Sequence, residues 1–235
     1  MVSLHGTTFR TYAPDAAKTG DLGDRHYAHD LAGRGYVVIA PDYVLLSDEY
    51  KTDPYQLGYA SGTMKGIVNH IRAVDLLVSL PEVNPKRIGA IGLSLGGHNA
   101  LFLGVFDPRV RAVVTSAGFN RFHKYYGGDL TGWTSPRYMP RIATEYAKDP
   151  DRVPFDFTEV LAALAPRPVF VNAPLGDTNF ELSGVVDCVN AARPVWERIF
   201  RAGDRLEAMY PEGGHGFSRP AREAAYAFLE RWLAR

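Results

Sequence analysis

The chain has 235 residues, of which 46% are hydrophobic and 22% charged, so its composition is that of a globular protein with its own core. Lys and Arg together number 26, as do Asp and Glu, and this balance argues against nucleic acid or an anionic membrane as the main partner. The single cysteine, Cys188, excludes an internal disulfide and a cysteine zinc site. We see no leader peptide and no apolar run near the ~20 residues of a membrane span, so we expect a cytoplasmic protein.

Short apolar runs predict about six strands in this chain. They cover residues 2–4, 36–40, 87–92, 110–116, 169–173 and 206–210. The runs show little polar alternation, which is typical of strands covered on both faces, as in a parallel sheet.

Longer amphipathic stretches between these runs predict helices. One helix should have an apolar face made of Ile67, Val68, Ile71, Val74 and Val78. An earlier helix should end at 31–35, and the helical stretch 183–202 should kink at Pro194. The last helix should have Ser218 as N-cap and Pro220 in its first turn. Strands alternate with helices throughout, so we predict one α/β domain over residues 1–235.

Two segments interrupt this alternation. Residues 7–22 form a polar loop, and residues 119–160 combine many aromatic residues with several Gly and Pro. Unstructured loops of that length are uncommon unless they are functional. We interpret 119–160 as a partly helical cap over a site, and a surface excursion that packs on itself is the alternative.

A pentapeptide of the form G-x-S-x-G, residues 92–96, centres on Ser94. It follows the predicted strand 87–92 and opens an apolar helix, which is the strand–turn–helix context that a nucleophilic serine requires. Gly92 and Gly96 leave room for the tight turn that exposes the serine hydroxyl. We therefore predict Ser94 as a nucleophile, against the alternative of a glycine-rich packing turn.

A serine hydroxyl needs a base, and the base needs an acid that orients it. His215 lies in a glycine-rich loop between the last predicted strand and the last helix, and Asp177 follows the strand 169–173. We predict these two as base and acid, with Glu181 as the second candidate for the acid. The other histidines are expected to be structural or solvated: His98 should point away from the nucleophile, and the remaining ones are His5, His26, His29, His70 and His123.

The oxyanion of an acyl transfer also needs donors. The backbone N–H of Leu95 is one candidate, and Gly6 would let the chain turn so that the N–H of Thr7 is the other. Four aromatic residues of the cap are candidate substrate contacts, although packing of the cap explains them equally well: Tyr125, Tyr126, Trp133 and Tyr138. No motif calls for a metal or another cofactor.

These motifs together resemble the α/β-hydrolase superfamily, in particular serine esterases near dienelactone hydrolases and acetyl-xylan-esterase-like enzymes. The resemblance is carried by residues 4–6, 35–42, 87–97, 166–169 with 176–177, and 213–217, in the order of that superfamily. It implies hydrolysis of a small-molecule ester through an acyl-serine intermediate and the triad Ser94, Asp177 and His215. The aromatic cap, in turn, leads us to expect a short, partly apolar acyl or aryl group. Dienelactone hydrolases proper use a cysteine, so Ser94 puts a lactone substrate in doubt.

The chain departs from that pattern at its beginning. Such folds usually carry two more strands before the loop at residues 5–6, and here that loop begins at residue 5. We therefore expect an unusually short, or N-terminally truncated, hydrolase without these two strands. The strand 36–40 would then lie at a sheet edge, which invites pairing with a second copy. We therefore expect a homodimer.

Two other function classes stay open. A peptidase or amidase on the same fold would share the acyl chemistry. A binding module without catalysis could also retain the scaffold, although an intact triad argues against it.

Overall fold

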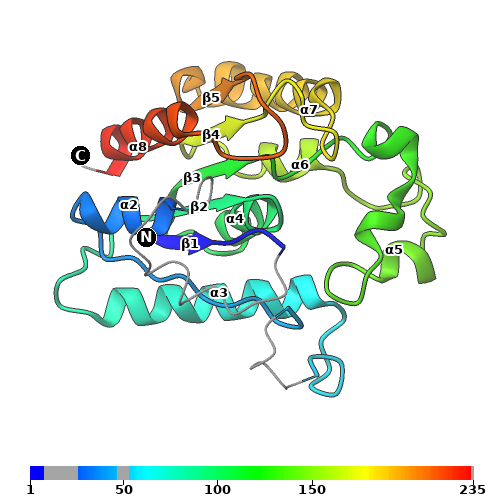
Figure 1. Ribbon diagram of the computed structural model, residues 1–235, viewed down its shortest axis with the longest axis horizontal. Helices are drawn as coiled ribbons and strands as arrows, with labels where there is room; N and C mark the ends of the chain where they lie inside the picture. Colours follow the sequence, from blue (N-terminus) through cyan, green and yellow to red (C-terminus); the bar gives the residue numbers. More distant parts are fainter. Residues whose placement is uncertain (8–25, 47–52, 234–235) are drawn as a thin grey trace.

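The computed structural model describes residues 1–7, 26–46 and 53–233. Within these residues, five parallel strands form one sheet in the order β1-β2-β3-β4-β5. The strands are β1 (Val2–Leu4), β2 (Ile88–Leu93), β3 (Val110–Ser116), β4 (Val169–Asn172) and β5 (Leu206–Met209). The strand β1 runs from the chain's first residues toward the side that carries the segment with α5, so the carboxyl ends of the parallel strands face that segment (Figure 1).

Helices cover both faces of the sheet, as the unbroken apolar runs predict. The helical elements are α2 (Tyr27–Gly33), α3 (Gly62–Ser79), α4 (Leu95–Phe106), η2 (Tyr125–Gly128), η3 (Leu130–Trp133), α5 (Arg141–Thr144), α6 (Phe157–Ala162), α7 (Leu182–Pro194), η4 (Val195–Ile199), η5 (Gly203–Arg205) and α8 (Arg219–Leu233). One core cluster joins α3, α4, α6 and α7 to the sheet, and a second joins α2 and α8 to it.

Alternate strand residues supply the two clusters. In β4, Val169 and Val171 belong to the first cluster, whereas Phe170 between them packs on Phe228 of α8, with ring centroids 5.5 Å apart. Successive side chains of a strand point to opposite faces, so a strand covered on both faces has apolar side chains at successive positions. The predicted α/β class with a parallel sheet is confirmed.

The prediction of a regular strand at residues 36–40 is wrong. The structure reduces it to a single parallel bridge between Ile39 and Val2 of β1, with Val37 38% exposed beside it. Gly35 adopts a left-handed φ of 88° just before this stretch, and Pro41 just after it has no N–H to donate to a ladder. The stretch nevertheless lies at the sheet edge, as expected.

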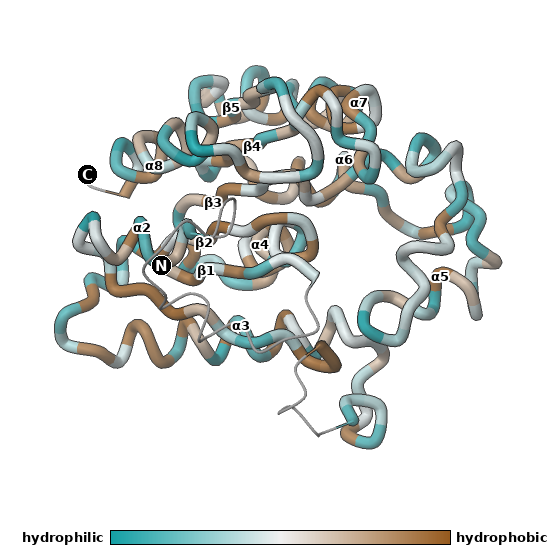
Figure 2. The backbone as a smooth tube through the Cα atoms, viewed as in Figure 1, coloured by the Kyte–Doolittle hydropathy of each residue, from teal (hydrophilic) through white to brown (hydrophobic). Residues whose placement is uncertain are grey.

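Helix α3 is rotated from the predicted orientation. Its buried positions include Gly66, His70, Val74 and Leu77, whereas Ile67, Ile71 and Val78 are only partly buried at the margin of the core. A Cβ at position 66 would crowd the ring of Tyr43, so the glycine allows this face of the helix to approach. Figure 2 shows apolar and polar colours alternating along α3, as expected for a helix buried on one side.

At Pro194, where the sequence predicts a kink, the α-helix α7 ends and the chain goes on as the π-helical turn η4. The segment 119–160 is partly helical, as expected, and contains η2, η3, α5 and the start of α6. The predicted polar loop 7–22 lies outside the described residues except for Thr7. Within the described part of the chain, no helix combines the length and apolar character needed to cross a bilayer.

Candidate active site

Ser94 occupies the sharp turn between β2 and α4. Its φ of 56° and ψ of −120° lie outside the regions favoured by a residue with a side chain. A Cβ at Gly92 would overlap the carbonyl of Gly96, and a Cβ at Gly96 would overlap the carbonyl of Leu4 in the neighbouring strand. Close backbone contacts therefore require glycine at both positions, and the turn holds Ser94 at the carboxyl end of the strands.

The three residues predicted as a triad meet at this turn. The Ser94 hydroxyl lies 2.8 Å from Nε2 of His215, and Nδ1 of His215 lies 2.9 Å from Oδ2 and 3.1 Å from Oδ1 of Asp177. The Asp177 side chain is 1% exposed, and it accepts backbone N–H bonds from Asn179 (2.8 Å) and Phe180 (3.0 Å). Because a carboxylate only accepts hydrogen bonds, Nδ1 carries the proton and Nε2 is free to accept the serine proton.

Buried polar groups at the strand ends hold the loop of His215. The hydroxyl of Ser116, the last residue of β3, donates to the carbonyl of Gly216 (3.1 Å) and accepts from Nδ2 of Asn172 in β4 (2.8 Å). The N–H of Gly176 donates to the carbonyl of Gly213 (2.8 Å), which ties the acid loop to the base loop. Sequence reasoning missed Ser116 and Asn172; their signal is a polar residue that ends an otherwise apolar strand.

A pocket of about 140 Å³ opens beside Ser94. It is lined by Thr7, Ser94, Leu95, His98, Tyr125, Gly132, Trp133, Tyr138, Asn179 and Phe180. Both predicted oxyanion residues and three of the four predicted aromatic contacts are therefore at the pocket. Tyr126 is the exception, because it is 61% exposed and does not belong to the lining.

The prediction for His98 was wrong in its direction. The ring lines the pocket and packs against Trp133, with centroids 5.0 Å apart, while Nδ1 contacts the carbonyl of Gly118 at 3.2 Å. Burial lowers the pKa of His98 to about 3, so the ring is a neutral wall of the pocket. His5 is structural, as predicted, because it is buried and its Nε2 accepts the backbone N–H of Tyr43 at 3.2 Å.

Glu181, the second candidate for the acid, and the single cysteine both lie away from the triad. The Glu181 carboxylate accepts the hydroxyl of Ser183 at the start of α7, whereas Asp177 is the carboxylate on His215. Cys188 is fully buried in α7, and burial raises the pKa of its thiol to about 12. A thiol in that state is not a nucleophile.

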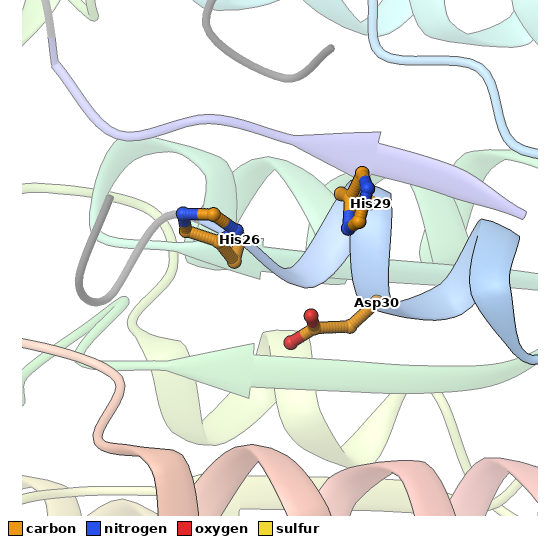
Figure 3. Close-up of side chains that lie close together, drawn as sticks. All are labelled: His26, His29 and Asp30. Atoms are coloured by element: carbon orange, nitrogen blue, oxygen red, sulfur yellow. The ribbon is translucent and has the colours of Figure 1, made fainter. Parts of the chain in front are cut away.

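One group of side chains in the described residues has the composition of a metal site. Ligand atoms of His26, His29 and Asp30, at the start of α2, lie within 4.8 Å of one another (Figure 3). The Asp30 carboxylate already accepts the hydroxyl of Tyr226 (2.8 Å) and lies 3.5 Å from Nε of Arg222. A cation there would compete with that arginine, and none of the three residues lines the pocket beside Ser94.

Comparison with known proteins finds similarity to a family of esterases. A family model described as glucuronyl esterase of fungi matches residues 61–199. The Bacillus subtilis protein named "Putative hydrolase YtaP" is 26% identical over 226 residues, which cover 88% of this chain and 68% of that protein. The 4-O-methyl-glucuronoyl methylesterase 1 of Wolfiporia cocos is 25% identical over 238 residues, and the chain spans 52% of its length.

Solved structures support the same fold. A glucuronoyl esterase from Solibacter usitatus aligns with a TM-score of 0.72 and 20% identity, over 97% of this chain and 73% of that one. A glucuronoyl esterase from Caldicellulosiruptor kristjansonii aligns with a TM-score of 0.75 and 22% identity, over 99% of this chain and 68% of that one. The α/β-hydrolase fold expected from the sequence is confirmed.

Proposed function

The chain belongs to the glucuronyl esterase family, a family of carboxylic ester hydrolases, and from this premise we propose that it hydrolyses esters of a uronic acid through an acyl-serine intermediate on Ser94. The observation that carries the proposal is the continuous contact from Ser94 through His215 to Asp177, next to a pocket that can receive an acyl group.

The geometry supports a two-step reaction. Oγ of Ser94 attacks the ester carbonyl as Nε2 of His215 takes its proton, and Asp177 stabilises the imidazolium that forms. His215 then protonates the leaving alcohol, and a water molecule attacks the acyl-serine in the same way. The N–H groups of Leu95, at the start of α4, and of Thr7 are placed in this proposal on the developing oxyanion.

The pocket chemistry supports a neutral, hydroxylated acyl group. Of the lining residues in the described part of the chain, none is Asp, Glu, Lys or Arg, whereas Thr7, Tyr125, Tyr138 and Asn179 offer hydroxyl or amide groups. An esterified uronic acid has no charge on its carboxyl group and carries ring hydroxyls. An aminopeptidase substrate would instead bring an ammonium group, and this lining offers no carboxylate to pair with it.

The test compares substrates of different acyl and leaving groups. We expect the methyl ester of glucuronic acid to be hydrolysed with a higher kcat/KM than short unsubstituted acyl esters, and aminoacyl amides to be inert. Ser94→Ala should abolish the activity and the labelling by a fluorophosphonate probe. Equal turnover of amide and ester substrates would favour the peptidase alternative, and no labelling of Ser94 would favour a binding module.

We also propose that the chain self-associates through the edge beside β1. The stretch 36–40 lies at the sheet edge, makes a single bridge to β1 and exposes Val37, and an apolar sheet edge invites pairing with a second copy. Light scattering coupled to size exclusion should give the mass of a dimer, and Val37→Lys should shift it to that of a monomer. A monomer in the unmodified protein would refute this part.

A further inference from the structure

Asn179 joins the pocket to the acid of the triad. Its backbone N–H donates to Oδ1 of Asp177 at 2.8 Å, so the position of its Cα is fixed relative to His215. Its side chain lines the pocket beside Ser94. The residue therefore has two separable parts: a backbone that supports the triad, and a carboxamide that takes no part in that backbone bond.

Tyr126 reaches this carboxamide from the segment 119–160. Its hydroxyl donates to Oδ1 of Asn179 at 3.3 Å. Tyr126 has a φ of 46°, and Gly127 and Gly128 follow with φ values of 68° and 95°. A tyrosine in the left-handed region is uncommon and costs free energy, and such residues cluster at ligand clamps.

The strained turn places an exposed phenol against the acid loop. The Tyr126 ring is 61% exposed and packs edge-to-face on Tyr125, with centroids 4.8 Å apart, and Tyr125 is a buried wall of the pocket. Burial of Tyr126 in a core therefore does not account for its conformation. The side-chain hydrogen bond that the structure shows for Tyr126 is the one to Asn179.

We propose that the carboxamide of Asn179 donates a hydrogen bond to a hydroxyl or ring oxygen of the acyl group, and that Tyr126 is the positioning residue that holds this carboxamide. The inference rests on the proposed function, because it takes the pocket beside Ser94 as the acyl site. Tyr126 donates to Oδ1, so that bond leaves the Nδ2 group of the same carboxamide as a donor.

Two of the other hydroxyls of the pocket lining already have each other as partners. The hydroxyls of Thr7 and Tyr138 lie 2.8 Å apart and hydrogen-bond each other. A site built to hydrogen-bond a substrate oxygen rejects the analogue that lacks it, because the polar group of the site is then left unpaired. Asn179 would therefore select hydroxylated acyl groups over alkyl groups of the same shape.

The experiment measures one ratio, kcat/KM for a methyl glucuronate divided by kcat/KM for methyl cyclohexanecarboxylate. The two acyl groups share a six-membered ring, and the second has no ring oxygen or hydroxyl. We expect this ratio to be large in the unmodified protein and to fall about 10-fold or more in Asn179→Leu. Tyr126→Phe should lower it about 2- to 5-fold.

A double-mutant cycle tests the positioning role. If Tyr126 acts through Asn179, the double variant should have the ratio of Asn179→Leu alone. Effects that multiply would show that Tyr126 acts independently and would overturn that part. Asn190→Leu, at an exposed position of α7, and Tyr210→Phe are matched controls that should leave the ratio unchanged.

Two further outcomes separate the proposals. A ratio near one in the unmodified protein, or an unchanged ratio in Asn179→Leu, overturns the inference while the esterase activity stands. Hydrolysis of neither ester, or full hydrolysis by Ser94→Ala, refutes the proposed function itself. The readout in the unmodified protein does not depend on whether a variant folds.

Discussion

Nδ1 of His215 lies 2.9 Å from Oδ2 of Asp177, while Glu181, four residues further along the chain, binds a serine hydroxyl at the start of α7. The tight turn after β4 makes this choice, because the backbone N–H groups of Asn179 and Phe180 both converge on the Asp177 carboxylate. These two backbone hydrogen bonds hold the Asp177 carboxylate in place independently of its contact with His215.

Asp177→Asn should lower kcat by about 10⁴-fold, because the amide would no longer hold the imidazole in the tautomer that accepts the serine proton. Glu181→Gln is the matched control and should change kcat less than 2-fold. Steady-state hydrolysis of an aryl ester checks both. Equal losses in the two variants would contradict the assignment of the acid.

Gly96→Ala should prevent folding or destabilise the protein severely, because its Cβ would overlap the carbonyl of Leu4 in β1. Gly33→Ala makes the same change at the end of α2, where nothing lies within 4 Å of the added atom, and should be neutral or stabilising by about 0.5–1 kcal/mol. Urea unfolding monitored by circular dichroism gives both free energies. A tolerated alanine at position 96 would contradict the proposed packing of the turn.

Stability should fall as the pH drops from about 6.5 toward 4. Burial lowers the pKa of His70 and of His98 to about 3, whereas an unfolded histidine titrates near its ordinary value. In that window the unfolded chain binds protons that the folded chain does not, so each histidine removes up to about 1.4 kcal/mol of unfolding free energy per pH unit.

His70→Gln and His98→Gln should each reduce the slope of the free energy of unfolding against pH. Urea titrations at pH 4 to 7 measure these slopes. A slope unaffected by either buried replacement would show that these groups do not titrate on unfolding.

Cys188 should resist alkylation in the native protein. The thiol is fully buried, and the raised pKa of about 12 leaves almost no thiolate at neutral pH. Iodoacetamide followed by mass spectrometry should find no adduct without denaturant and one adduct in urea. Cys188→Ala should retain esterase activity, and loss of activity with intact folding would reopen the question of its role.

Local patterns in the sequence determined much of this protein. Apolar runs predicted β1 to β5, and the spacing of Gly92, Ser94 and Gly96 predicted the turn, because close backbone packing restricts positions 92 and 96 to glycine. The order of Ser94, Asp177 and His215 followed from the resemblance to a known fold. The apolar runs and the glycine spacing depend on residues that are close together in the sequence, so both can be recognised from the sequence alone.

Tertiary contacts decided the rest. The apolar stretch 36–40 has the composition of a strand, but its pairing with β1 is limited to one bridge. His98 follows Ser94 by one helical turn, and the aromatic residues of 119–160 packed around it make it a wall of the pocket. The contact of Tyr126 with Asn179 joins residues 53 positions apart, and no local pattern encodes which side chains such a loop brings together.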